Sequence, residues 1–268
     1  MSEASIPTIR IEPPQPGRAF ALYARRLDGF DERLQATLAL LRQAAQTHAG
    51  RIVQASSLGA EDMVITDLIA RHGLPVAVAL IDTGRLHNET HDLRQRAEVH
   101  WDLRFEVWRP DPEAVRAFEA EHGPHAMYRS QALRHACCGL RKVEPLRRML
   151  AGRTAWITGL RREQSDARAA VEKVALDEAG RAKYSPLADW RWADVWHYLQ
   201  THGVPYHPLH DAFMPSIGCA PCTRPIAVGE DLRAGRWWWE RDALRECGLH
   251  LSGAAALPSN PPMARSQP

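Results

Sequence analysis

Four of the five cysteines in the chain stand in two pairs, a pattern typical of proteins that hold a metal centre. Cys137 and Cys138 are adjacent, whereas two residues separate Cys219 from Cys222. Structural zinc sites place about two to four residues between the members of a pair, so that the backbone can wrap around the ion. An iron–sulfur cluster offers several irons, so neighbouring thiolates can each bind a different one. The spacing therefore favours an iron–sulfur cluster, with a structural zinc site as the alternative.

The fifth cysteine, Cys247, stands apart from these pairs, near the C-terminus. Arg233 and Arg236 precede it, and nearby positive charges favour the nucleophilic thiolate form of a cysteine. Three consecutive tryptophans at 237–239 are interpreted as a packing anchor for this segment. We therefore expect residues 231–251 to form a mobile arm that carries Cys247 as a nucleophile, with an inert thiol as the alternative.

Lys142 follows Cys138 by four residues, which is about one turn of a helix. Its ammonium group would then lie near both an anionic metal centre and an anionic ligand beside that centre. A solvated surface lysine is the alternative interpretation.

Three turns with small residues follow predicted strands, at 56–62, 81–85 and 158–161. The first is not a Walker loop, because no Gly-Lys-Ser/Thr follows it. At the ends of parallel strands, such turns converge on one crevice and offer backbone N–H groups and arginines to a mononucleotide. The turns therefore predict a nucleotide pocket beside the metal centre, with ordinary loop chemistry as the alternative.

The elements that must position these residues alternate between strands and helices. This order predicts an α/β fold with a mostly parallel sheet flanked by helices, and with ligands at the carboxyl ends of the strands. A helical segment between the third and fourth strands carries the first cysteine pair. The predicted strands cover 51–56, 75–82, 105–108 and 155–158, and the predicted helices cover 20–48 (one or two), 63–72, 88–100 and 192–202.

Length and composition are those of one domain with tails. A chain of 268 residues, 45% of them hydrophobic, can bury a sizeable core. We expect an α/β domain over 18–230, the arm over 231–251, and disordered tails over 1–17 and 252–268.

The same totals exclude several classes of protein. The longest apolar run, 75–81, is too short to span a membrane, and no signal-peptide pattern opens the chain, so we expect a cytoplasmic protein. A net charge of +2 gives no case for nucleic-acid binding. Five cysteines in that compartment argue against a disulfide framework.

Several motifs resemble those of a known family, the assimilatory adenylyl-sulfate reductases, which are the APS branch of the phosphoadenylyl-sulfate reductases. The resemblance runs from about residue 50 to about residue 250. Its fold would be that of the adenine-nucleotide alpha-hydrolases. The motifs are SSLGAED (56–62), IDTGRLHNET (81–90), CCGLRKVEPL (137–146), GCAPCTRPI (218–226), RAGRWWWE (233–240) and ECGLH (246–250).

The resemblance implies a role for each matching residue. The two cysteine pairs would bind one 4Fe-4S cluster, and Cys247 would be the nucleophile. One departure is Asn88, where the family commonly has proline; this should alter a helix start and leave the chemistry unchanged. The positions implied to contact substrate are Ser57, Gly59, Thr83, Gly84, Arg85, Lys142, Gly159, Arg161, Arg233 and Arg236.

The implied reaction is the thioredoxin-dependent reduction of adenylyl sulfate to sulfite and AMP through an enzyme S-sulfocysteine, in sulfate assimilation towards cysteine. A reductase of the 3'-phosphorylated substrate, or one of dual specificity, is the first alternative. A zinc-stabilised nucleotide-binding module without catalysis is more distant. An ATP-consuming hydrolase or ligase would need a Ser-Gly-Gly-x-Asp-Ser loop, which the sequence lacks. A homo-oligomer is compatible with all of these.

Overall fold

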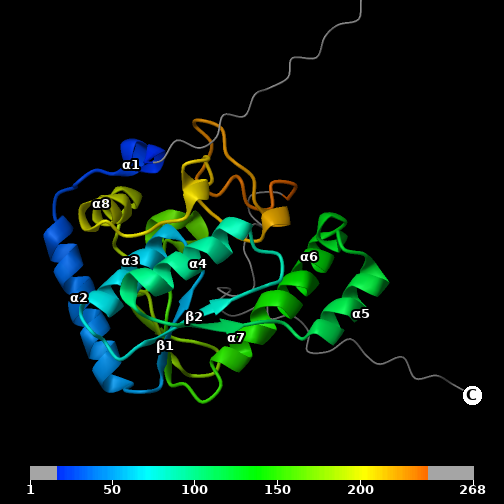
Figure 1. Ribbon diagram of the computed structural model, residues 1–268, viewed down its shortest axis with the longest axis horizontal. Helices are drawn as coiled ribbons and strands as arrows, with labels where there is room; N and C mark the ends of the chain where they lie inside the picture. The colour runs from blue at the N-terminus through cyan, green and yellow to red at the C-terminus, as the bar shows by residue number, and fades with distance from the viewer. Residues whose placement is uncertain (1–16, 241–268) are drawn as a thin grey trace, which may run out of the picture.

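The computed structural model of the protein describes residues 17–240, which form an α/β fold around one six-stranded sheet (Figure 1). The strand order is β3-β2-β1-β4-β6-β5, and every pair of neighbours is parallel except β5 with β6. The predicted, mostly parallel sheet is thereby confirmed. The strands are β1 (Ile52–Ser56), β2 (Ala77–Ile81), β3 (Phe105–Trp108), β4 (Ala155–Ile157), β5 (Val174–Leu176) and β6 (Ala182–Tyr184).

Helices flank the sheet on both sides, as predicted. The segment expected to hold one or two helices holds two, α1 and α2, and α3 begins at Ala60, three residues before its predicted start. Figure 1 shows α2, α3 and α8 together on one side, whereas α7 lies across β1 and β2 from them. The α-helices are α1 (Arg18–Tyr23), α2 (Phe30–Thr47), α3 (Ala60–Arg71), α4 (Asn88–Trp101), α5 (Pro112–His122), α6 (Gln131–Cys138), α7 (Glu144–Met149) and α8 (Trp192–His202).

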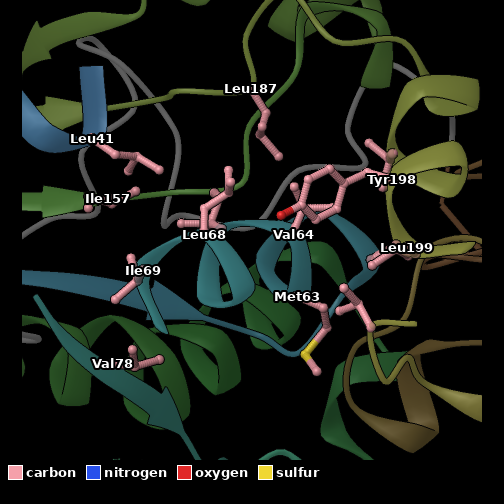
Figure 2. Close-up of a cluster of buried hydrophobic side chains, with 14 of the residues drawn as sticks. Leu41, Met63, Val64, Leu68, Ile69, Val78, Ile157, Leu187, Tyr198 and Leu199 are labelled. Carbon is pink, nitrogen blue, oxygen red and sulfur yellow. The ribbon is translucent and has the colours of Figure 1, made fainter. Parts of the chain in front are cut away.

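The core has two layers because successive strand residues point to opposite faces of the sheet. In β1, Ile52 joins the larger layer, which packs against α2, α3 and α8, and Val53 joins the smaller layer against α7. Figure 2 shows part of the larger layer, which contains Leu68 of α3, Val78 of β2 and Tyr198 of α8, whose side chain lies beside α3. Both faces are therefore buried, which explains the nearly continuous apolar runs of β1 and β2.

The sequence pattern does not predict β5 and β6. Both strands have only three residues and are partly exposed, and the charged residues Lys173, Asp177, Arg181 and Lys183 interrupt the apolar signal around them. They form a hairpin that adds to the sheet beside β4. Their pairing is decided by the sheet edge that β4 offers rather than by their own residues.

No helix within residues 17–240 is long and apolar enough to cross a membrane.

Candidate functional site

A cleft of about 230 Å³ opens where β1, β2 and β4 end. Its lining includes residues from all three predicted turns, so the convergence expected from the sequence is confirmed as geometry. Most positions that the family resemblance singled out contribute to it. Those that line the cleft are Ser57, Gly59, Thr83, Lys142, Gly159, Arg161, Arg233 and Arg236.

Gly84 and Arg85 do not line this cleft. Gly84 has a φ of +70°, which favours glycine, and its N–H donates to Asp82 Oδ1 at 3.0 Å, so it shapes the turn after β2. Arg85 faces a second, smaller cavity, and its guanidinium pairs with Glu119 at 2.6 Å.

The turn between β1 and α3 is held by Asp62. Its Oδ2 accepts hydrogen bonds from the N–H of Ser57 at 2.6 Å and from the Ser57 hydroxyl at 2.7 Å. Leu58, fully buried, adopts a φ of +59°, a left-handed conformation that the surrounding contacts must stabilise. The turn therefore leaves the first turn of α3, which carries Glu61 and Asp62, facing the cleft.

Gly159, at the end of β4, lies directly against this turn. A Cβ at this position would lie 2.5 Å from Asp62 Oδ1 and 3.0 Å from Glu61 Cβ. Because both neighbours are held in place, we expect Gly159→Ala to destabilise the fold by about 1–3 kcal/mol, as measured by urea unfolding. Gly59→Ala is the matched control, since its Cβ would make only ordinary contacts. Equal stability of the two variants would contradict this prediction.

The charge of Asp62 should make stability depend on pH. Burial, opposed by the hydrogen bonds from Ser57, raises the pKa of Asp62 from 3.8 to about 6. Between about pH 4 and about pH 6, the folded state therefore holds a proton that the unfolded state has lost. Folding becomes less favourable as pH rises through that window, by about 3 kcal/mol.

The measurement is the free energy of unfolding of the wild type minus that of Asp62→Asn, followed from about pH 4 to about pH 8. The fixed cost of losing a carboxylate oxygen cancels in the change of this difference. We expect the difference to fall by about 3 kcal/mol as pH rises and then to level off. A difference that is constant across the range would show that Asp62 does not titrate in this way.

Arg161 lies at the cleft, and two glutamates neutralise its positive charge. Its buried guanidinium pairs with Glu61 at 2.9 Å and with Glu163 at 2.7 Å, and it stacks on Trp192. Burial raises the pKa of Glu61, but Arg161 and the hydrogen bond from Gln164 act together in the opposite direction, and the net pKa lies below its usual range. This arginine therefore shapes one end of the cleft, where positive and negative charges alternate.

Arg236 also lies at the cleft, but no carboxylate within residues 17–240 neutralises its positive charge. It is only 7% exposed, and within residues 17–240 it forms no ion pair and its Nε has no hydrogen-bond partner. One guanidinium nitrogen donates to the carbonyl of Ile217 at 3.2 Å, and the group stacks on the Trp237 ring. A buried cation without a carboxylate is costly unless an anion joins it, so this end of the cleft is suited to an anionic group.

The four paired cysteines line one small cavity beside the cleft, and all four are buried and free of disulfides. Cys137 and Cys138 end α6, whose first turn Ser130 caps by accepting from the Leu133 N–H. A π-helical turn, Gly139–Val143, follows directly and carries Lys142. Such turns are rare and often mark functional sites.

Hydrogen-bond donors surround the thiols. Thr83 Oγ1 lies 3.2 Å from Cys219 Sγ. Burial raises the pKa of Cys219, but Lys142, the Thr83 hydroxyl and two nearby arginines together outweigh burial, so the net pKa lies below the usual range. Burial and the nearby Cys219 raise the pKa of Cys222 to about 12. Metal binding must therefore displace protons from some of these thiols.

The donor set suits a group with several metal atoms. Four thiols share one cavity, and two of them, Cys137 and Cys138, are adjacent in the chain, so each can bind a different iron of one cluster. Arginines beside the thiols can offset the negative charge of a thiolate-bound cluster. The residues present therefore fit an iron–sulfur cluster better than a lone zinc ion.

Two residues line both the cysteine cavity and the cleft: Lys142 and Cys219. A metal centre held by the thiols would thus be next to a ligand in the cleft. The alternative reading of Lys142 as a solvated surface residue does not agree with this position.

The segment that leads towards Cys247 is anchored on the cysteine cavity. Trp237 is 1% exposed and packs in the same cluster as Cys137, Cys219 and Cys222, as expected for an anchor. Glu240 forms a two-bond ion pair with the fully buried Arg134, at 2.8 and 2.7 Å. Cys247 itself, the rest of the predicted arm and both predicted tails, save Gly17, lie outside the described residues.

Sequence reasoning missed the partners that fix these side chains. Glu61 lies in the SSLGAED motif (56–62). A negative charge beside a predicted anion site could have indicated that Glu61 pairs with a cation such as Arg161. Arg134 and Gln164, which donates to Glu61 at 2.9 Å, gave no signal, because their partners are distant in the sequence.

Comparisons with known proteins agree with this geometry. The phosphoadenosine phosphosulfate reductase domain matches residues 51–225. The chain is 49% identical over 224 residues to adenosine 5'-phosphosulfate reductase of Allochromatium vinosum, covering 83% of this chain and 87% of that protein. It is 50% identical over 230 residues to the enzyme of the same name from Burkholderia cepacia, covering 85% and 90%.

Solved structures share the fold. Phosphoadenylyl-sulfate reductase from Candida auris, in a phosphate complex, superposes with a TM-score of 0.60 at 26% identity, over 74% of this chain and 98% of that one. An FMN adenylyltransferase from Candida glabrata shares the architecture alone, with a TM-score of 0.54 at 13% identity, over 85% of this chain and 82% of that one. The resemblance of the motifs is therefore confirmed, and the chain belongs to the phosphoadenosine phosphosulfate reductase family.

Proposed function

We propose that the protein reduces adenylyl sulfate to sulfite and AMP, with thioredoxin as the electron donor, in sulfate assimilation. The curated relatives at 49% and 50% identity are named for this substrate. One observation carries the proposal: Lys142 and Cys219 line both the nucleotide cleft and the four-cysteine cavity. An anionic substrate and a metal centre would thus share the same cation.

Cys137, Cys138, Cys219 and Cys222 would hold a 4Fe-4S cluster in this proposal. When bound, the cluster supplies an electrostatic field next to the substrate and no electrons, since the electrons come from thiols. The protein side chains do the remaining work. Lys142, Arg233 and Arg236 bind the sulfate and phosphate oxygens, which allows a thiolate to approach a substrate of the same charge.

The nucleophile would be Cys247, on the arm proposed for residues 231–251. Its thiolate attacks the sulfur of the substrate, a new S–S bond forms, and the anhydride S–O bond breaks as AMP leaves with the electron pair. A thioredoxin thiolate then attacks the Cys247 sulfur, and sulfite leaves with the electrons of the S–S bond. The second thioredoxin thiol closes a disulfide, so two thiols are oxidised for each sulfite formed. The anchored residues 237–240 support an arm that begins beside the cleft.

The experiment is to mix anaerobically purified protein with adenylyl sulfate, without reductant, and to measure its intact mass. We expect one sulfonate adduct and one AMP released per chain, with no adduct in Cys247→Ser. Peptide mapping must place the adduct on Cys247. Wild-type protein that binds nucleotide but forms no adduct would overturn the mechanism.

A reductase of the 3'-phosphorylated substrate is the second candidate, since the matched domain and the Candida auris structure are both named for it. The ratio of kcat/KM for the two substrates decides between them. A ratio in favour of the phosphorylated substrate would overturn the assignment to adenylyl sulfate and leave the family unchanged.

A further inference from the structure

His210 is a buried histidine of the nucleotide cleft to which no role has been given above. It ends the short 3-10 turn Pro208–His210, is 1% exposed, and lines the cleft. Its ring lies edge-on to Trp192 and Trp196, with ring centroids 6.1 Å and 5.1 Å away. These contacts hold the imidazole in one place at the cleft wall.

Neither ring nitrogen of His210 makes a hydrogen bond with any residue in the range 17–240. The Met214 carbonyl lies close enough to favour the protonated ring, but not in hydrogen-bonding geometry. His207, three residues earlier and equally buried, is satisfied: its Nε2 lies 2.9 Å from Thr90 Oγ1, and its Nδ1 accepts from the Leu209 N–H. A buried polar group without a partner is costly and rare, so the partner of His210 is expected to come from the cleft.

The charge state of His210 limits what that partner can be. Burial lowers the pKa of His210 to about 4, although Glu61, Met214 and Asp211 act in the opposite direction. The ring is therefore neutral near pH 7, with one N–H donor and one lone-pair acceptor. A neutral ring does not supply the positive charge that sulfate or phosphate oxygens call for.

The position of His210 in the cleft also favours an uncharged partner. His210 lies near Glu61, at the end of the cleft where Arg161 forms ion pairs with Glu61 and Glu163. Arg236 lies at the other end, close enough to the thiols to influence Cys219. The anionic groups of a nucleotide would go to the cationic end, which leaves its nucleoside for the end with His210. A ribose hydroxyl both donates and accepts, as neutral imidazole does.

We infer that His210 is a further substrate-binding residue, which hydrogen-bonds a ribose hydroxyl of the nucleotide. The inference rests on the function proposed above, because it requires a nucleotide in this cleft. It adds a contact that fixes the substrate at the end remote from the reacting sulfur, and so aligns that sulfur for attack.

The test is calorimetric titration of the anaerobic full-length protein with AMP, 2'-deoxy-AMP, 3'-deoxy-AMP and inosine monophosphate. For the wild type, we expect one of the deoxy compounds to bind about tenfold more weakly than AMP. His210→Phe should bind AMP about tenfold more weakly and should no longer distinguish that deoxy compound from AMP. His210→Gln, which can still hydrogen-bond, should recover part of the affinity. His72→Gln, at the exposed end of α3, is the control and should bind like the wild type.

Several outcomes would overturn the inference. If wild-type protein binds both deoxy compounds as tightly as AMP, His210 makes no ribose contact. This comparison uses the wild type alone, so it remains valid even if His210→Phe fails to fold. Inosine monophosphate as the only weakened ligand would assign His210 to the base instead. Unchanged AMP binding by folded His210→Phe removes the residue from the site and leaves the proposed function intact. Wild-type protein that binds no AMP overturns the proposed function, and this inference with it.

Discussion

Cys247→Ser protein is expected to lose turnover of adenylyl sulfate by at least about a thousandfold while it keeps its full iron content. A serine hydroxyl is hardly ionised near neutral pH, so it cannot replace a thiolate as nucleophile. The iron should remain because four other cysteines, which are buried together around one cavity, are sufficient to hold the cluster. The measurements are steady-state sulfite release with thioredoxin, and iron per chain after anaerobic purification.

The matched variant is Cys219→Ser, which removes one of the paired thiols. Here we expect the reverse order of events, in which iron and its visible absorbance are lost first and activity falls as a consequence. AMP titration checks that the cleft is intact in both variants. Loss of iron from Cys247→Ser would show that the division between four ligands and one nucleophile is wrong.

Arg236→Leu is expected to lower kcat/KM by about 100-fold to 1,000-fold. Arg236 is a buried cation at the cleft with no ion pair among residues 17–240, and it influences the Cys219 and Cys222 thiols. Its charge therefore has to be met by an anion, and charge that develops on the sulfate and on leaving AMP would meet it. Arg236→Lys should recover only part of the rate, because lysine cannot form two parallel hydrogen bonds to an anion.

The design must separate lost chemistry from lost folding, because Arg236 also pairs with Thr223 through a backbone bridge. Thermal unfolding and iron content are therefore measured for each variant. The control is Arg104→Leu, which removes an exposed arginine after α4 and keeps the net charge equal to that of Arg236→Leu. If folded, iron-loaded Arg236→Leu retains the wild-type kcat/KM, the arginine does not bind the reacting anion.

Much of the architecture followed from local patterns. Apolar runs alternating with helical periodicity were sufficient for the parallel sheet, because β1, β2 and β4 are buried on both faces. The turns after these strands were expected to meet, because the carboxyl ends of parallel strands share one edge of the sheet. Only the edge hairpin of β5 and β6 was missed, since partly exposed strands carry a weaker signal.

Local sequence patterns did not show which charged side chains form ion pairs. Arg161, Arg85 and Arg236 look alike in the sequence, each close to a small-residue turn or a cysteine motif. In the structure, Arg161 is matched by two glutamates and Arg85 by Glu119, whereas Arg236 has no carboxylate partner within the described chain. Which cation remains for a substrate depends on carboxylates that tertiary folding brings close.

The amino-acid sequence was sufficient to identify the kinds of groups available: two thiol pairs, a separate fifth cysteine, and three turns that end strands of one sheet. Tertiary contacts were needed to show that Lys142 and Cys219 line both cavities and that Arg134 is bound to Glu240. They also show that neither ring nitrogen of His210 has a hydrogen-bond partner within residues 17–240. The reason is physical. Strands and turns arise from backbone preferences of neighbouring residues, whereas burial and pairing depend on contacts such as that of Arg134 and Glu240, which are 106 residues apart.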